Sequence, residues 1–96
     1  MKLEFEWDKD KAAANQRLHG LAFQEAIKVF RDPFGVEWID NREDYGEERV
    51  NLVGMCGGVI IHVTFTERSE RIRIISARRA VRHEQEDYYR ANSHGR

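Results

Sequence analysis

The sequence predicts an α+β fold with the element order β-α-α-β-β-β-β-α, in which helices pack on an antiparallel sheet. Two patterns support this prediction. Some segments alternate apolar and polar residues, which is typical of strands with one buried face. Others repeat apolar residues at spacings of three and four, which is typical of helices. With 96 residues, the chain is long enough for one domain, which we expect over residues 1–91, followed by a flexible C-terminal tail at 92–96.

The N-terminal segment predicts a strand followed by a helix. Its apolar residues alternate with glutamates and are Leu3, Phe5 and Trp7. Asp8 then stands where an N-cap carboxylate accepts hydrogen bonds from the first free amides of a helix. Residues 9–19 are rich in alanine and unbranched side chains, which favour a helix. Gly20 ends this helix, because glycine readily adopts the left-handed conformation that follows a helix end.

The rest of the chain predicts a second helix, four strands and a third helix. Helical spacing relates Phe23, Ala26, Ile27 and Phe30, and Asp32 with Pro33 ends that helix. The expected strands cover residues 36–39, 49–55, 59–65 and 71–74, and Gly57-Gly58 is a hairpin signal. We expect the last three strands to form an antiparallel meander. From Ala77 onward, helical spacing predicts a helix through Ala80, Val81, Glu84 and Tyr88.

Several classes of protein are excluded by composition. The chain has no run of about 18 apolar residues, so we expect no membrane span. Its N-terminus lacks the apolar run of a secretory signal. Cys56 is its one cysteine, which excludes an internal disulfide and a cysteine-cluster metal site. The four histidines are too scattered to predict a metal site. We therefore expect a cytoplasmic protein without a metal or cofactor.

Basic residues concentrate in the second half of the chain. Residues 1–48 hold 7 Lys and Arg against 12 Asp and Glu, whereas residues 49–96 hold 9 against 5. Between Arg68 and Arg82 there are six arginines and one acid, Glu70. An arginine side chain presents a planar fork of donors that matches phosphate oxygens in pairs. This segment therefore predicts a site for an anion, although the net charge of the chain is only −1.

Side chains alternate between the two faces of a strand, and this alternation places a set of polar residues on the sheet face opposite the core: Arg49, Asn51, His62, Thr64, Arg71 and Arg73. Side chains on neighbouring antiparallel strands would lie roughly 5–8 Å apart. We interpret this face as a platform that binds a phosphodiester. The alternative is a solvated face whose arginines pair with glutamates.

Arginines at the two ends of the last strand add to this platform. Arg68 lies in the turn before it, and we expect Arg78 and Arg79 to begin the last helix, where free amides favour an anion. The alternative is an ion pair of Arg78 or Arg79 with an acid such as Glu84. His19 is explained either by its place at a helix C-terminus or by general acid–base catalysis.

Four ordered segments resemble the BrnT family of type II toxin–antitoxin toxins, over nearly the whole chain to about Tyr88. They are F-E-W-D-x-x-K-A-x-x-N-x-x-x-H-G from Phe5, F-x-E-A-x-x-V-F-x-D-P from Phe23, Y-G-E-E-R from Tyr45 and T-E-R-x-x-x-I-R-I-I-S-A-R-x-A from Thr66. The polar positions that match are Asp8, Lys11, Asn15, His19, Glu48, Arg49, Arg68, Arg73 and Arg78. His62 departs from the aliphatic residue expected there, and Leu18 from a frequent lysine.

The resemblance implies a RelE-like fold and cleavage of cellular RNA. It also implies neutralisation by a cognate DNA-binding antitoxin, BrnA, and binding of operator DNA through the complex. Our hypothesis is a metal-independent endoribonuclease in which Arg68, Arg73 and Arg78 clamp phosphate beside Arg49, and Glu48 or His19 carries a proton. The residues expected to bind flanking RNA are Lys11, Arg71 and Arg79. The alternative is a module that binds nucleic acid or an antitoxin without catalysis.

Overall fold

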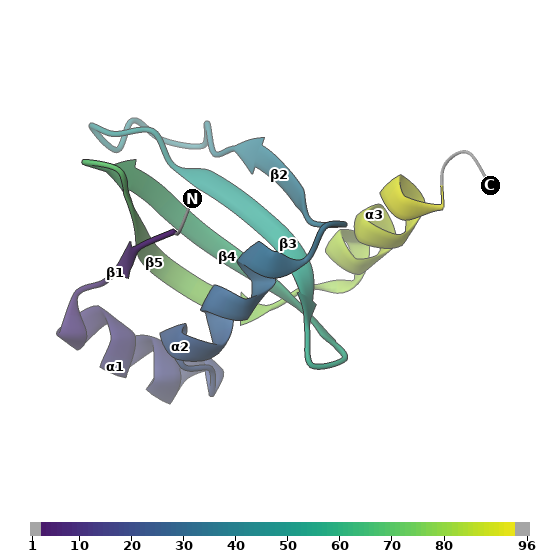
Figure 1. Cartoon of the computed structure of the whole chain (residues 1–96), viewed down its shortest axis with the longest axis horizontal. Coiled ribbons are helices and arrows are strands. Elements are labelled where there is room, and N and C mark those ends of the chain that lie inside the picture. Colours follow the sequence, from purple (N-terminus) through teal and green to yellow (C-terminus); the bar gives the residue numbers. More distant parts are fainter. Residues whose placement is uncertain (1–2, 94–96) are drawn as a thin grey trace.

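The computed structural model describes residues 3–93 and confirms the α+β class (Figure 1). Its elements are β1 (Phe5–Glu6), α1 (Lys9–His19), α2 (Phe23–Ala26), a 3-10 helix η1 (Ile27–Arg31), β2 (Val36–Ile39), β3 (Val50–Cys56), β4 (Val59–Arg68), β5 (Arg71–Arg79) and α3 (Arg82–Asn92). Of the tail expected at 92–96, Asn92 is the last residue of α3, and residues 94–96 lie outside the described part of the chain.

The five strands form one mixed sheet in the order β1-β5-β4-β3-β2. Consecutive strands from β2 to β5 pair antiparallel, as the hairpin spacing predicted for the last three. β1 instead lies parallel to β5, with Phe5 opposite Ile72. The prediction of a wholly antiparallel sheet is therefore wrong at this pair. Period-two alternation indicates which side chains are buried, but not which strand lies alongside or in which direction.

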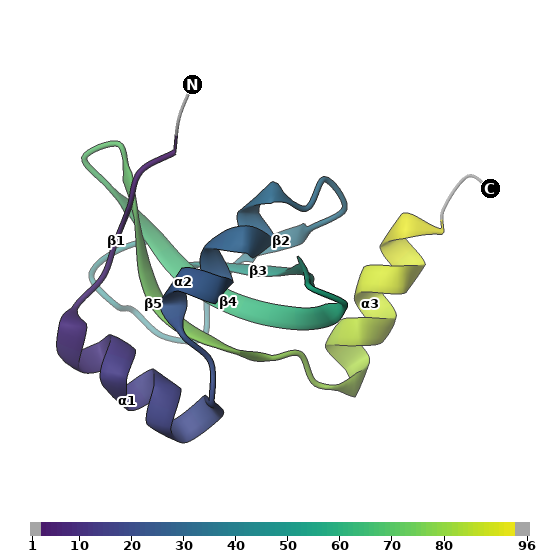
Figure 2. The same ribbon diagram turned by 60° about the horizontal axis from the view of Figure 1, so that its bottom comes forward.

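The two faces of the sheet are covered by different helices, and α1 and α3 lie at opposite ends of the molecule (Figure 2). The helical face is covered by α1, α2 and η1. Its buried core consists of Phe23, Ala26, Val29, Leu52, Ile61, Val63, Phe65, Ile72, Ile74 and Ala77. On the opposite face, called the outer face below, Tyr88 of α3 packs at one end with Val53, Ile60 and Ala80. The remainder of the outer face is thereby left for polar side chains.

The C-terminal helix α3 is attached to the body of the protein through Tyr88. The Tyr88 hydroxyl donates to Oδ2 of Asp32 at 2.6 Å, and the same oxygen accepts from the amide of Met55 at 2.7 Å. Burial, together with the Asp32 carboxylate, raises the pKa of Tyr88 to about 12. At the helix end, Nδ2 of Asn92 donates to the carbonyl of Phe34 at 2.9 Å. These bonds fix the position of α3 on the sheet.

Asn15 completes the edge of β5 beyond the short strand β1. Its Nδ2 donates to the carbonyl of Ala77 at 2.8 Å, and its Oδ1 accepts from the amide of Ala77 at 3.1 Å. Nδ2 also donates to the carbonyl of Leu21 at 3.0 Å. Because Asn15 is buried, these backbone groups cannot pair with water instead. One side-chain amide thus joins α1, the following loop and the sheet.

A bulge in β5 decides which of its side chains face outward. Pairing with β4 shifts register between Thr64 and Phe65, where Ile75 is the additional residue. One additional residue reverses the alternation of all the side chains that follow it. Arg73 and Arg78, five positions apart, consequently both lie on the outer face. In a regular strand, they would point to opposite faces.

The same bulge explains why the sequence misplaced the start of the last helix. The prediction that the helix begins at Ala77, with Arg78 and Arg79 in its first turn, is wrong. β5 continues to Arg79, and α3 begins at Arg82. The interruption of the alternation at Ile75 is typical of a strand end, although the backbone continues to pair with β4. Arg78 and Arg79 are therefore strand residues, away from a helix N-terminus.

We predict that Asn15→Ala destabilises the fold by about 2–4 kcal/mol, because it leaves buried backbone groups of Ala77 without partners. Urea denaturation monitored by circular dichroism measures this loss. Gln16→Ala is the matched control, since Gln16 is exposed on the same helix and should change the midpoint little. Equal midpoints for Asn15→Ala and Gln16→Ala would show that the Asn15 amide is not a structural link.

Candidate functional site

The middle of the outer face carries polar and aromatic side chains from four neighbouring strands. Trp38 of β2 lies opposite Asn51 of β3, and His62 of β4 lies opposite Arg78 of β5. Thr64 lies between β3 and β5, and its hydroxyl donates to Oδ1 of Asn51 at 2.7 Å. Adjacent strands are about 4.8 Å apart, so these side chains form one continuous surface. We call these five residues the polar band.

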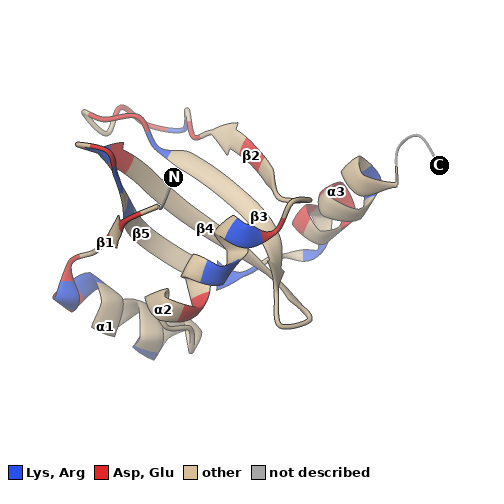
Figure 3. Ribbon diagram, viewed as in Figure 1, with Lys and Arg blue, Asp and Glu red and all other residues tan. Residues whose placement is uncertain are grey.

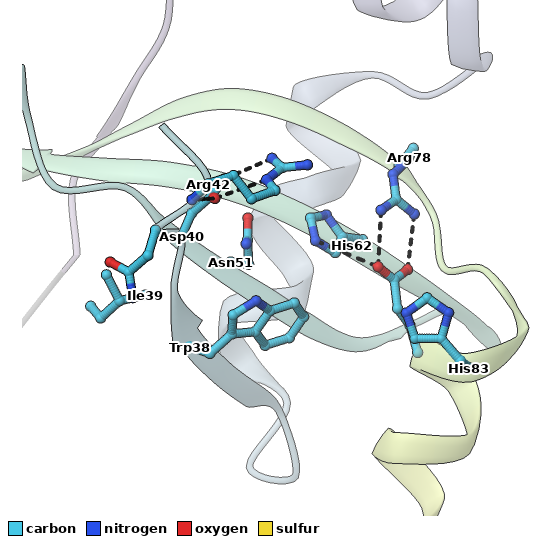
Figure 4. A pocket seen from close by; sticks show the side chains of 10 residues that line it. Trp38, Ile39, Asp40, Arg42, Asn51, His62, Arg78 and His83 are labelled. Atoms are coloured by element: carbon cyan, nitrogen blue, oxygen red, sulfur yellow. Dashed lines mark hydrogen bonds and ion pairs between the residues drawn. The ribbon is translucent and has the colours of Figure 1, made fainter. Parts of the chain in front are cut away.

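An open cavity of about 510 Å³ lies over the polar band, beside the first turn of α3 (Figure 4). It is lined by Trp38, Ile39, Asp40, Asn41, Arg42, Asn51, His62, Arg78, His83 and Glu84. Its volume lies within the range of about 300–1,000 Å³ that is typical of sites for small molecules. The cavity therefore has room for a group the size of a nucleotide base or phosphate.

Arg78 and Glu84 form a bidentate ion pair on the α3 side of the cavity. Nη1 and Nη2 of Arg78 each donate to one oxygen of Glu84 at 2.9 Å. The amide of Val81 also donates to Oε1 of Glu84 at 2.9 Å. Burial by itself raises the pKa of Glu84, but the bonds from Arg78 and Val81 lower it below its ordinary value. The alternative that Arg78 pairs with Glu84 is confirmed, and the ionised carboxylate holds the guanidinium in place.

His62 lies in the floor of the cavity and is 6% exposed. Its Nε2 is 3.7 Å from Oε2 of Glu84, which is too long for a hydrogen bond. Burial is the main cause that lowers the pKa of His62, and the nearby charge of Arg78 lowers it further. His62 is therefore a neutral imidazole at neutral pH. Its ring contacts the indole of Trp38, with the centroids 5.6 Å apart.

Asp40 and Arg42 form a second ion pair on the β2 side of the cavity. Nη2 and Nε of Arg42 donate to the two oxygens of Asp40 at 2.8 and 2.9 Å. These hydrogen bonds are the main cause that lowers the pKa of Asp40 to about 2. The side chain of Arg42 is 75% exposed. The cavity is thus bordered on two sides by arginines that buried carboxylates orient.

Four arginines gather at the other end of the sheet, around the β4–β5 turn, and each lies beside an acidic side chain. Figure 3 shows basic and acidic segments near one another at this end. Arg49 and Arg68 both lie beside Glu47, at 3.4 and 3.5 Å. Arg73 lies 3.0 Å from Glu6, which is also the neighbour of Arg71 at 3.7 Å. Arg68, Arg71 and Arg73 have few acidic residues near them in the sequence, but the fold places acidic side chains beside them. Partly exposed pairs of this kind contribute little energy, about 0–1 kcal/mol each, and leave the arginines able to exchange partners.

The structure separates some residues that the sequence grouped together. Lys11 and His19 are exposed on α1, which belongs to the helical face, so the structure does not bring them together with Arg73 and Arg78. Arg79 pairs in register with Ile61 and points to the helical face as well. Glu48 is exposed in the loop before β3. It lies near the β4–β5 turn, because its carbonyl accepts from the hydroxyl of Thr66 at 2.7 Å.

Three residues that line the cavity were missed by sequence reasoning: Asp40, Arg42 and His83. Asp40 and Arg42 stand in a polar loop that looks solvated in the sequence, and only the fold buries the Asp40 carboxylate. His83 is exposed in the first turn of α3 and borders the cavity. Trp38 points to a site in this region already in the sequence, because a tryptophan ring can stack on a base.

Within residues 3–93 there is no group of three or more His, Cys, Asp and Glu side chains that could hold a metal ion. No helix there is long and apolar enough to cross a membrane.

Residues 7–84 match the protein family described as the ribonuclease toxin BrnT of type II toxin–antitoxin systems. The chain belongs to the BrnT family. The match extends from the end of β1 into the first turn of α3, so it includes Arg78, His83 and Glu84. No curated protein matches the chain. A BrnT protein is a ribonuclease toxin, and a type II toxin implies a cognate antitoxin as its partner.

We predict that Asp40→Asn lowers the stability of this BrnT protein at pH 7 but has a smaller effect in acid. A carboxyl group whose pKa is lowered by folding stabilises the fold above its unfolded pKa, and loses this contribution as the pH falls to its folded pKa. For Asp40 this pH window runs from 3.8 down to about 2.

Urea midpoints of the wild-type and Asp40→Asn proteins at pH 7 and pH 2.5 measure the effect. Glu37→Gln, at an exposed position of β2, is the control. A difference that stays constant with pH would contradict the role of the Asp40 carboxylate.

Proposed function

We propose that this BrnT chain is a metal-independent endoribonuclease that cleaves cellular RNA and thereby inhibits growth. The RNA 2′-hydroxyl attacks the adjacent phosphorus, the 5′ oxygen of the next nucleotide leaves, and a 2′,3′-cyclic phosphate remains. Such a reaction needs a proton acceptor, cations beside the phosphorane and a proton donor for the leaving oxygen. The observation that carries the proposal is the outward placement of both Arg73 and Arg78 on one sheet face.

Arg78 is the residue best placed to clamp the scissile phosphate. Three hydrogen bonds use N–H groups of its guanidinium, two to Glu84 and one to the carbonyl of Arg79. A guanidinium has about five N–H groups in all, so two remain for phosphate oxygens. Because Glu84 already fixes the plane of the guanidinium, binding of a phosphate costs little side-chain entropy. Arg78 is thus oriented before the substrate arrives.

The four arginines around the β4–β5 turn supply contacts to flanking phosphates. Thr66 and His62, which lie opposite Arg73 and Arg78, are four positions apart on β4, or about 13 Å. An extended RNA strand that runs along β4 therefore reaches from Arg78 to Arg73. Arg49, Arg68 and Arg71 lie beside Arg73 and share its acidic neighbours. Phosphates compete with those acids for the arginines.

Among the described residues, we assign the proton transfer beside Arg78 to His83. His83 is exposed and borders the same cavity as Arg78. His62 also borders it, but burial lowers its pKa and so makes it a weaker proton acceptor, and its Nε2 faces Glu84. Glu48 lies near the β4–β5 turn and His19 ends α1 on the other side of the sheet. In this proposal, Glu48 contacts flanking RNA, and His19 does not contact the scissile phosphate.

The partner and the cellular location follow from the same proposal. We propose that a BrnA-like, DNA-binding antitoxin neutralises the toxin, that the complex binds operator DNA, and that the toxin acts in the cytoplasm. We also propose that the fold is RelE-like, with α1, α2 and η1 on one face of the sheet and α3 at one end of the other. A second candidate function is a binding module without catalysis. The acidic partners of Arg49, Arg68, Arg71 and Arg73 favour it, since they neutralise that end of the outer face.

We predict that Arg78→Ala and Arg73→Ala lower the rate of RNA cleavage, by about 100-fold or more for Arg78. Arg82→Ala is the matched control, because its side chain is 94% exposed. Cleavage of a defined RNA in buffer with EDTA, with mapping of cyclic phosphate ends, measures the rate. Circular dichroism establishes that each variant is folded. Folded variants of Arg73 and Arg78 with wild-type cleavage would overturn the proposed site, and loss of wild-type cleavage in EDTA would overturn the metal-free mechanism.

We further predict that His83→Gln lowers the cleavage rate by about 100-fold, whereas His19→Gln changes it little. The two substitutions remove the same chemical group from exposed positions on different sides of the sheet. Single-turnover cleavage at saturating enzyme compares them. The opposite order, with His19→Gln inactive and His83→Gln active, would place proton transfer on the helical face.

A further inference from the structure

Trp38 offers an aromatic surface at the mouth of the cavity. It lies on β2, which is the outermost strand and pairs only with β3 in the described sheet. Its indole ring makes an edge contact with the ring of His62, with an angle of 67° between the two planes. This contact orients the indole. The residue is nevertheless 41% exposed. An oriented and exposed indole ring is the surface on which unstacked nucleic-acid bases pack.

Asn51 offers a polar group beside that aromatic surface. It is only 4% exposed, and its Oδ1 accepts from the hydroxyl of Thr64. Among residues 3–93, no oxygen accepts a hydrogen bond from its Nδ2. No side-chain nitrogen or oxygen in that range is both sealed from solvent and without a partner. The Nδ2 of Asn51 therefore opens onto the cavity that Asn51 lines. Whichever way the amide is turned, one of its ends pairs with Thr64 and the other faces the cavity.

The charges around the cavity leave the aromatic and amide groups free for a neutral ligand. Asp40 is paired with Arg42 and Glu84 with Arg78, so neither carboxylate is an unpaired anion that would repel RNA. Figure 4 shows Trp38 and Asn51 on one side and Arg78 with His83 on the other, with His62 between them. A base beside Trp38 would thus belong to the nucleotide whose phosphate contacts Arg78.

From these contacts we infer that the cavity is a base-binding subsite, in which a single unstacked RNA base packs on Trp38 and pairs its edge with Asn51. This inference rests on the proposed ribonuclease function and adds a source of substrate preference to it. Stacking on an aromatic side chain tolerates any base, whereas the edge contact depends on hydrogen-bonding groups. Trp38 thus supplies affinity, and Asn51 supplies the contact that distinguishes bases.

The test uses the full chain and a short 2′-O-methyl RNA, which cannot undergo attack by the 2′-hydroxyl. The fluorescence of Trp38 is followed in the Trp7→Phe protein, which removes the other tryptophan. We expect the oligonucleotide to quench Trp38. We expect an oligonucleotide with an abasic site at the preferred position to bind about tenfold more weakly.

Variants at two positions separate the subsite from the catalytic groups. Trp38→Ala should weaken binding by about tenfold or more, and Trp38→Phe should retain most of it because the aromatic ring remains. Asn51→Ala should lower the cleavage rate of the preferred RNA to that of RNAs with another base at the cut, so that the base preference is lost. Circular dichroism and urea midpoints establish that the variants fold like the wild type.

Three outcomes would overturn the inference. The first is equal binding of the intact and abasic oligonucleotides. The second is unchanged base preference in folded Asn51→Ala. The third is quenching of Trp38 by the purified antitoxin and not by RNA, which would make the cavity a protein interface. In each case RNA cleavage by the wild-type protein tests the proposed function separately, since a protein that cleaves RNA without base preference retains the function and lacks the subsite.

Discussion

The bulge at Ile75 is the feature on which the outer face depends. Without it, β5 would alternate regularly, and Arg73 and Arg78 would point to opposite sides of the sheet. With it, both arginines lie on one face while Ile74 and Ala77 remain in the core of the helical face. Bulges are common next to functional sites, because they redirect side chains at little cost to the strand pairing. In this BrnT chain, the bulge joins the two ends of the outer face into one polar surface.

The electrostatics of that surface rest on carboxylates that are held by arginines. Glu84 stays ionised because Arg78 and the Val81 amide outweigh the effect of burial on its pKa. Asp40 stays ionised because of Arg42. Each acid fixes one arginine and leaves part of its guanidinium exposed toward the cavity. This surface holds several arginines although the net charge of the chain is −1, because each of them lies beside an acidic side chain.

Local patterns in the sequence were sufficient for the α+β class, the Asp8 and Gly20 helix boundaries and the meander of β3 to β5. They were insufficient where long-range contacts decide. The parallel partner of β1 and the continuation of β5 through the bulge are set by pairing across the sheet, which alternation alone does not encode. The family resemblance was detectable because four segments occur in order. The cavity was not detectable, because Trp38, Arg42 and His83 meet only after folding.

The central claim is that RNA binds along the outer face, between Arg73 and Arg78. Nuclear magnetic resonance of the arginine side-chain Nε–H groups tests it most directly, on titration with a 2′-O-methyl RNA that cannot be cleaved. The account predicts that the signals of Arg73 and Arg78 shift together, while those of Arg17 on α1 and Arg31 on η1 stay in place. Shifts confined to Arg17 and Arg31 would put the RNA on the helical face and contradict the account.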